Sequence, residues 1–394
     1  MTDTGTRATD TNDSGTTETD TVVRPLTLAV DQTEIDDLAR RLDATRWPDE
    51  APDAGWADGL PLAYAKELAE YWRDRFDWRA QEERLNAVPQ FTTGIDGHDI
   101  HFFHVRSSRP DAKPLLLVHG WPSGPTDFLL MIPLLTEPDD GGQAFDVIAP
   151  TIPGFGVSGP VTRWTLTGVA DAFAELMERL GYDRYLVHGY DTGAGVAREL
   201  GLRHGDHVAG IHTTGMLGGE ELTEETADMS VPEEAAAIAD GYRYMYDVGG
   251  YAMLQSTRPQ SISYALTDSP VAQMSWLVER FRDWSAAEGD PDEVLDRDEM
   301  LTVVSIYWFF RTAGSSARYY KYGLPDWSEP LQPSTVPTAI LVMPDDIGRP
   351  VRRLVETTDN VVHWTAAERG GHFAAWEQPE LVAADIRAGI GDLT

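Results

Sequence analysis

The chain has 394 residues, of which 42% are apolar, so it can bury the core of an enzyme-sized fold and a smaller second unit. It contains no cysteine, which excludes disulfides, thiolate metal ligands and a cysteine nucleophile. The formal net charge is -34, so nucleic acids and anionic membranes would be repelled. No apolar run approaches the roughly 20 residues that span a bilayer, and we expect a soluble, cytoplasmic protein.

The charged residues are unusual in kind as well as in number. Lys66, Lys113 and Lys321 are the only lysines, and the acidic residues are spread along the whole chain. Such a surface is typical of proteins from salt-loving organisms, in which counterions screen the repulsion between like charges. An acidic protein from a high-GC organism is the alternative, and composition leaves both interpretations open.

Helical patterns come first in the chain. Ile35, Leu38 and Leu42 form one apolar stripe, which predicts a helix that ends before residue 47. A second helix is expected over Pro61–Arg75. Together they predict a helical N-terminal region over residues 24–90.

Strand patterns follow. Two short β-type runs, Phe91–Ile95 and Ile100–Val105, flank Asp96-Gly97 and predict a hairpin. Further short apolar runs bounded by turn residues predict strands at Leu115–Val118, Val147–Ala149, Tyr185–Val187, Ile211–Thr213 and Ala339–Val342. Amphipathic helices lie between several of them, as at Leu166–Leu180 and Ala194–Arg203. Alternating strands and helices predict an α/β fold with a mostly parallel sheet that is covered on both faces.

One long segment lacks strand patterns. Residues 218–322 are helical in pattern and rich in Met, Trp and Tyr, which predicts a cap over the carboxyl edge of the sheet, where ligands bind in open α/β folds. The expected organisation is a disordered acidic tail (1–23), the helical N-terminal region (24–90), a first core segment (91–217), the cap (218–322) and a second core segment (323–394).

The strand at residues 185–187 leads into a Gly-x-Asp-x-Gly sequence, Gly189 to Gly193, with Asp191 in the middle. This pattern predicts a sharp strand-to-helix turn with a carboxylate where ester hydrolases carry a serine nucleophile. The N-terminus of the following helix favours an anion at that point. A plain helix-capping Asp is the structural alternative for the pentapeptide taken alone.

Three other segments complete a candidate catalytic site. His372 lies after two glycines and before the helix that begins near Pro379, where this chain order places a catalytic base. Asp345 and Asp346 directly follow a predicted strand. Asp346 is the expected orienting acid, with Asp345 as the alternative.

The sequence His119-Gly120-Trp121-Pro122 ends the strand before the first crossover helix. The backbone N–H groups of Trp121 and Thr192 are therefore the expected oxyanion-hole donors. A tight turn packed by a tryptophan is the structural alternative for this loop.

With these motifs in place, the chain after Arg24 resembles the microsomal-type epoxide hydrolases of the α/β-hydrolase fold. The similarity rests on the helical N-terminal region, the loop at 119–122, the elbow at 189–193, the cap stretches 250–259, 268–270 and 315–320, and the segment 370–375. It implies that two cap tyrosines, Tyr251 and Tyr320, hold the epoxide oxygen, with Tyr319 as the alternative to Tyr320. It also implies a cis Trp121-Pro122 peptide.

The same resemblance implies substrate contacts for His119, Gly120, Pro122 and Tyr190, a small epoxide and water as reactants, and no cofactor or metal. Oligomeric state stays open, a homodimer included. Two departures from the family pattern stand out. Tyr190 and Thr192 flank Asp191 where a small residue and Trp are usual, and Ser123-Gly124 follows Pro122 where Gly usually comes first.

The expected reaction forms an alkyl ester on Asp191 that water, activated by His372, then hydrolyses to a vicinal diol. The alternative enzyme is a haloalkane dehalogenase, which shares the fold and the Asp nucleophile. Its halide is held by indole N–H donors, one usually after the nucleophile, where this chain has Thr192. A binding protein without catalysis on the same scaffold is the third reading, because fold does not dictate function.

The composition yields a first test. If the acidic, lysine-poor surface is a halophilic adaptation, the unfolding temperature should climb substantially from low to molar KCl, because salt screens the repulsion. Thermal unfolding followed across a KCl series measures this. A flat or falling curve would discard the halophilic interpretation and leave the enzyme assignment untouched.

Overall fold

The structure is a computed structural model that describes residues 21–139, 141–215, 222–323 and 331–393. Within them a nine-stranded sheet forms the centre, in the order β1-β2-β3-β5-β4-β6-β7-β8-β9. The first three pairs in this order, β1-β2, β2-β3 and β3-β5, are antiparallel. All the later pairs, from β5-β4 to β8-β9, are parallel. The strands are β1 Arg24–Pro25, β2 Gln90–Ile95, β3 His98–Val105, β4 Lys113–Val118, β5 Phe145–Pro150, β6 Tyr185–Tyr190, β7 Val208–Thr214, β8 Ser334–Val342 and β9 Asp359–Ala366.

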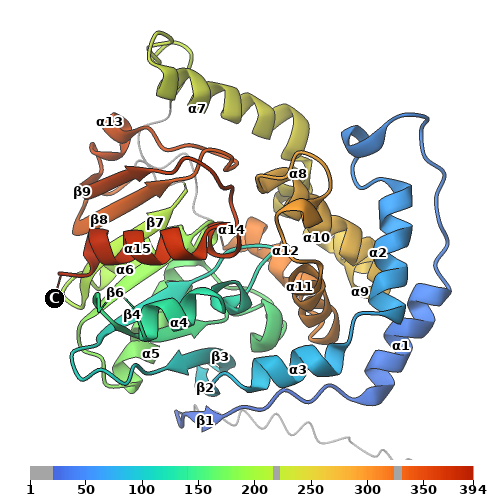
Figure 1. Cartoon of the computed structure of the whole chain (residues 1–394), viewed down its shortest axis with the longest axis horizontal. Helices are drawn as coiled ribbons and strands as arrows, with labels where there is room; N and C mark the ends of the chain where they lie inside the picture. The colour runs from blue at the N-terminus through green and yellow to red at the C-terminus, as the bar shows by residue number, and fades with distance from the viewer. Residues whose placement is uncertain (1–20, 140, 216–221, 324–330, 394) are drawn as a thin grey trace, which may run out of the picture.

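Helices cover both faces of the sheet, which confirms the predicted α/β architecture (Figure 1). One face carries α5 (Leu166–Arg179) and α6 (Thr192–Arg203), and the other carries α4 (Met131–Thr136) and α15 (Pro379–Ile390). Side chains of β4 alternate between the two resulting cores: Leu116 and Val118 enter one, Leu115 and Leu117 the other. Because every residue of such a strand is buried, the predicted strands read as short apolar runs.

The predicted hairpin is present, and Asp96 and Gly97 turn the chain with φ of 49° and 77°. The described part of the expected cap is helical. It consists of α7 (Pro232–Arg243), a π-helical turn (Tyr244–Val248), α8 (Gly250–Thr257), α9 (Pro259–Asp268), α10 (Pro270–Trp284), α11 (Arg297–Phe309) and α12 (Ala313–Tyr322). The expected start of the cap at residue 218 lies outside the described residues.

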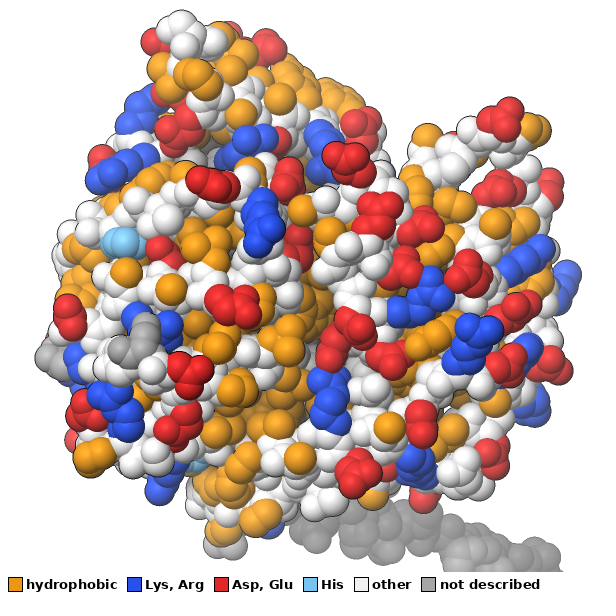
Figure 2. All heavy atoms as spheres, viewed as in Figure 1, with side chains coloured by type: hydrophobic (Ala, Val, Ile, Leu, Met, Phe, Trp, Pro, Cys, Tyr) orange, Lys and Arg blue, Asp and Glu red, His pale blue; other side chains and the backbone are white. Residues whose placement is uncertain are grey.

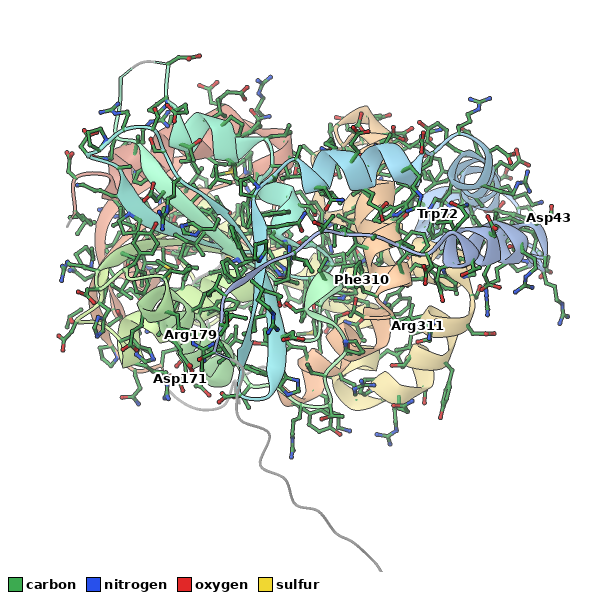
Figure 3. The ribbon with its side chains drawn as sticks, turned by 90° about the horizontal axis from the view of Figure 1, so that it is seen from below. Asp43, Trp72, Asp171, Arg179, Phe310 and Arg311 are labelled. Atoms are coloured by element: carbon green, nitrogen blue, oxygen red, sulfur yellow. The ribbon has the colours of Figure 1, made fainter. Side chains whose placement is uncertain are left out.

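The N-terminal helices pack against the cap. They are α1 (Gln32–Asp43), α2 (Leu62–Asp74) and α3 (Trp78–Asn86), and α1 and α2 lie against α10. From α2, the indole N–H of Trp72 donates to the hydroxyl of Ser305 in α11 at 2.9 Å, in a fully buried contact (Figure 3). The N-terminal region thus braces the cap from the side opposite the sheet.

Five elements were not anticipated. Helix α3 has six polar or charged residues among nine and shows no apolar stripe, and the carboxylate of Asp77 caps it by accepting from the N–H of Ala80. The edge strand β9 is only partly buried, so its sequence lacks an apolar run. The short helices α13 (Arg352–Val355) and α14 (Ala374–Glu377) complete the fold, and the two-residue β1 was also unpredicted. The disorder expected for residues 1–23 falls almost wholly on residues 1–20, which lie outside the described residues.

On the face shown in Figure 2, acidic and basic side chains are interspersed rather than gathered in one patch. Many form ion pairs, such as Arg203 with Asp171 at 2.6 Å and Arg349 with Asp240 at 2.6 Å. Such pairs contribute little individually and leave the overall negative charge in place. No helix in the described ranges is long and apolar enough to cross a membrane.

Buried histidines make stability depend on pH. Burial lowers the pKa of His101 to about 3 and those of His104 and His119 to about 4, and it also lowers the pKa values of His188 and His212. These rings stay neutral in the fold but take up protons in the unfolded chain below about pH 6.5. Each therefore removes about 1.4 kcal/mol of stability per pH unit below that value.

We predict that the urea midpoint falls as the pH drops from about 6.5 to about 5, at constant ionic strength. Replacing the buried His104 by Asn should flatten that dependence, whereas replacing the exposed His207 should leave its slope unchanged. His372 offsets this trend only slightly, because it is protonated in the fold and already half or more protonated in the unfolded chain over that range. A midpoint that holds steady or rises on acidification would show that these histidines are not held neutral.

Candidate active site

Asp191 occupies the turn between β6 and α6. Its φ of 51° is in the left-handed region, which is a strained conformation for a residue other than glycine. The flanking glycines permit the turn: a Cβ on Gly193 would collide with the carbonyl oxygen of Val118, and one on Gly189 would collide with that of Gly193. The turn thus presents the Asp191 side chain at the carboxyl edge of the sheet, as the Gly-x-Asp-x-Gly pattern predicts.

The Asp191 carboxylate is held as an anion. Burial alone would raise its pKa, but His372 and the backbone N–H groups of Thr192 and Trp121 together lower the pKa below its usual value. The N–H of Trp121 donates to Oδ1 of Asp191 at 2.9 Å. The two amides expected to form an oxyanion hole therefore meet at this carboxylate.

His372 lies between two carboxylates. Its Nδ1 is 2.7 Å from Oδ1 of Asp346, and its Nε2 is 3.6 Å from Oδ2 of Asp191, beyond hydrogen-bond distance. Burial lowers the pKa of His372, but the two carboxylates outweigh it and raise the pKa to about 10. In the structure it is Asp346 that contacts His372, whereas Asp345 pairs through its backbone with Gly371 in a β-bridge.

The two cap tyrosines lie across from these groups. Tyr251 stacks on Trp121 with ring centres 5.2 Å apart, and Tyr320 meets Trp121 edge-on at 5.5 Å. The rings of Tyr251 and Tyr320 also meet edge-on, with centres 5.6 Å apart. Tyr319, the alternative to Tyr320, instead packs its ring against Phe155. The structure thus brings together Tyr251 and Tyr320 above the loop that carries Trp121.

The loop at 119–122 is built partly as expected. The peptide between Trp121 and Pro122 is cis, and a Cβ on Gly120 would collide with the Asp191 side chain, so only glycine fits there. His119, however, uses both ring nitrogens on backbone: Nδ1 contacts the carbonyl oxygen of Gly120 at 2.8 Å, and Nε2 accepts from the N–H of Ile152 at 3.0 Å. The ring nitrogens of His119 thus brace the loop, and the substrate contact expected for His119 stays a prediction.

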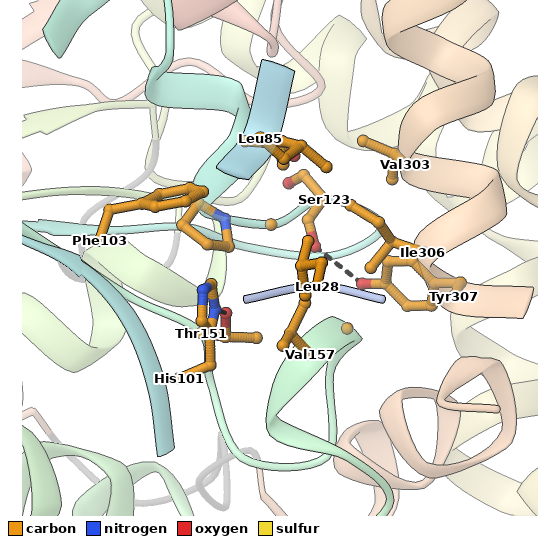
Figure 4. A pocket seen from close by; sticks show the side chains of 14 residues that line it. Leu28, Leu85, His101, Phe103, Ser123, Thr151, Val157, Val303, Ile306 and Tyr307 are labelled. Carbon is orange, nitrogen blue, oxygen red and sulfur yellow. Dashed lines mark hydrogen bonds between the residues drawn. The ribbon is translucent and has the colours of Figure 1, made fainter. Parts of the chain in front are cut away.

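The hydroxyl of Tyr190 is also bound by other residues of the protein. Its hydroxyl donates to the buried carboxylate of Asp127 and lies 2.6 Å from the Ser123 hydroxyl, while its ring packs edge-on against His372. Burial raises the pKa of Asp127 to about 7. Behind this network lies a cavity of about 20 Å³, room for a single water, where the Tyr307 hydroxyl donates to the Ser123 carbonyl at 2.8 Å (Figure 4).

Two supporting contacts had no sequence signal. The N–H of His372 donates to the carbonyl oxygen of Trp284 at the end of α10, at 2.7 Å. The carboxylate of Glu377 accepts from the N–H groups of both Ala286 and Gly371, at 2.9 and 3.0 Å. These bonds fasten the histidine loop to the cap. The bond between Ala286 and Glu377 joins residues 91 positions apart, and sequence spacing gives no hint of such a pair.

In the described ranges, no group of three or more His, Cys, Asp or Glu side chains is arranged to hold a metal ion. The parallel sheet, the elbow at Asp191 and the His372–Asp346 pair beneath a helical cap define an α/β hydrolase.

Comparisons with known proteins narrow that class. The family described as "Epoxide hydrolase N terminus" matches residues 23–128, and the alpha/beta hydrolase fold family matches residues 113–251. A predicted epoxide hydrolase of Stigmatella aurantiaca is 43% identical over 93% of this chain and 84% of its own length. Epoxide hydrolase 1 of Sus scrofa is 34% identical over 94% of this chain and 89% of its own.

Among solved structures, the Aspergillus niger epoxide hydrolase superposes with a TM-score of 0.84 at 29% identity, over 95% of this chain and 98% of that one. The juvenile hormone epoxide hydrolase of Bombyx mori gives 0.86 at 26% identity, over 95% of each chain. The chain therefore belongs to the epoxide hydrolase family, which confirms the resemblance drawn from its motifs.

Proposed function

We propose that this protein hydrolyses an epoxide to a vicinal diol through a covalent ester on Asp191, which water activated by His372 then cleaves. The observation that carries the proposal is the position of His372. Its Nδ1 is bound to Asp346, and its Nε2 is buried without a hydrogen-bond partner among the described residues, 3.6 Å from Asp191. A water at Nε2 would lie next to the carboxyl carbon of Asp191.

Ring opening needs a nucleophile on one side of the epoxide and an acid on the other. An oxygen of Asp191 attacks a ring carbon, the C–O bond breaks, and Tyr251 or Tyr320 gives its proton to the leaving oxygen. Burial raises the pKa values of both phenols well above their usual range, so both carry a proton at neutral pH. A carboxylate suits this step because it forms an ester that water can cleave, whereas an alkylated serine would be an ether.

Ester formation also prepares His372 for its role. The high pKa of His372 depends partly on the negative charge of Asp191, and alkylation removes that charge. The pKa of His372 then falls, its proton leaves, and the neutral ring can deprotonate water. The hydroxide adds to the ester carbonyl, and the N–H groups of Trp121 and Thr192 stabilise the oxyanion before the diol departs.

A haloalkane dehalogenase is the alternative enzyme on this scaffold. It calls for an indole N–H donor directly after the nucleophile, where this chain has Thr192, whereas the cap packs Tyr251 and Tyr320 against Trp121. Hydroxyls that donate to oxygen favour the epoxide. The domain boundaries, the cytoplasmic location and the oligomeric state stay predictions.

A base-deficient variant tests both the substrate class and the covalent step. His372→Gln should react once with styrene oxide and stop, so its mass should rise by one substrate on the peptide that contains Asp191. A panel of chloroalkanes should leave its mass unchanged. Intact-protein and peptide mass spectrometry give both readings.

The matched control adds Tyr251→Phe and Tyr320→Phe to His372→Gln, which removes both acids and should abolish the adduct. An adduct that forms at the same rate without the two phenols would contradict their assignment. Alkylation by chloroalkanes and not by the epoxide would favour the dehalogenase.

A further inference from the structure

A third tyrosine joins the two cap phenols from the outer side. The hydroxyl of Tyr244 lies 3.1 Å from the hydroxyl of Tyr251. Tyr251 is 3% exposed, whereas Tyr244 is half-buried and its chain neighbours Met245 and Tyr246 are 70% and 72% exposed. The hydroxyls of Tyr251 and Tyr244 thus lead from the interior of the site toward the surface of the cap, and the ring of Tyr320 packs edge-on against that of Tyr251.

The backbone is shaped to place this side chain. Helix α7 ends at Arg243, and residues Tyr244–Val248 form a π-helical turn before α8 begins. A Cβ on Gly249 would collide with the carbonyl oxygen of Tyr244, so the widened turn depends on glycine there. Single π turns in proteins occur often at functional sites, because they redirect one side chain at a cost in helix geometry.

One buried cation, Arg280, lies beside the cap phenols. The buried guanidinium of Arg280 stands 5.0 Å from the centre of the Tyr251 ring and is fixed on α10 by Asp283 and Glu279. Burial raises the pKa of Tyr244, and Asp191 adds to that, whereas the bond with Tyr251 and the charge of Arg280 lower it. Besides burial, Tyr251, Asp191 and Arg280 are thus the groups that shift the pKa of the Tyr244 hydroxyl.

The proposed reaction leaves a proton deficit on the tyrosine side. Ring opening takes one proton from a cap phenol and leaves a phenolate, while His372 loses one proton when the Asp191 charge disappears. Hydrolysis returns a proton from water to His372, and the diol leaves with no further change. The phenolate must therefore recover one proton, equal to the one that His372 released, before the next epoxide can be opened.

We propose that Tyr244 is a positioning residue that acts through Tyr251 and conducts this proton from solvent to the cap phenols. In that step the Tyr244 O–H bond breaks as the Tyr251 O–H bond forms, and a surface water then reprotonates Tyr244. The inference rests on the proposed function, because the deficit exists only if a cap phenol protonates the epoxide oxygen. Tyr244 itself does not touch the substrate.

The test compares Tyr244→Phe with Tyr246→Phe, which lies on the same turn and is exposed. The first turnover of Tyr244→Phe should run at the wild-type rate, because its cap phenols start protonated. Later turnovers should slow by roughly tenfold, which is less than the effect of losing a directly acting acid, since water partly replaces the lost hydroxyl. Rapid-quench kinetics should therefore show a burst of one diol per enzyme, absent in Tyr246→Phe and in the wild type.

Imidazole buffer should restore the later turnovers of Tyr244→Phe, because a small acid can enter and protonate the phenolate, whereas a packing defect would not respond to it. The proposal fails if Tyr244→Phe shows no burst. It also fails if the first turnover of Tyr244→Phe slows as much as the later ones and imidazole restores neither rate. The ester on His372→Gln is measured separately. If His372→Gln forms the ester but Tyr244→Phe shows no burst, only the proton-conducting role of Tyr244 is overturned. If His372→Gln forms no ester, the proposed function itself is overturned.

Discussion

The structure depends on keeping one buried carboxylate charged. Asp191 sits at the edge of the sheet in a strained backbone conformation, and burial by itself would favour its neutral form. Two backbone N–H groups and the protonated ring of His372 reverse that preference. Gly120 is required because a Cβ there would collide with the Asp191 side chain, and the elbow glycines Gly189 and Gly193 are required because a Cβ on either would collide with neighbouring backbone.

The second requirement follows from the first. In the proposed reaction a group across from Asp191 must protonate the epoxide oxygen, and the cap tyrosines are the groups proposed for that step. The bonds from Trp284 and Glu377 fix the histidine loop to the cap, and α1, α2 and α3 hold the cap from outside. The N-terminal region, which looks remote from the site in the chain, is thus part of what sets the distance between Asp191 and the cap tyrosines.

The sequence predicted the central sheet and the residues that meet at Asp191, because both depend on local patterns: short apolar runs, glycine spacing and the loop at 119–122. Sequence alone named Asp346 as the partner of His372 but kept Asp345 as the alternative. The structure shows which of these two adjacent side chains points toward the His372 ring. The bonds of His119 to Ile152 and of Tyr190 to Asp127 had no sequence signal, because these partners lie far away in sequence. The position of Tyr244 was not predicted, because a π-helical turn leaves no periodic signal in the sequence. Strand β9 was not predicted, because an edge strand need not be apolar.

The covalent role of Asp191 is the central claim, and the origin of the oxygen in the first diol tests it most directly. With enzyme in excess and a single turnover in oxygen-18 water, the added oxygen should come from the Asp191 carboxylate, so the diol should be mostly unlabelled. The peptide that contains Asp191 should become heavier over repeated turnovers. A first diol that carries the full solvent label, with that peptide still light, would mean that water attacks the epoxide directly and that Asp191 is no nucleophile.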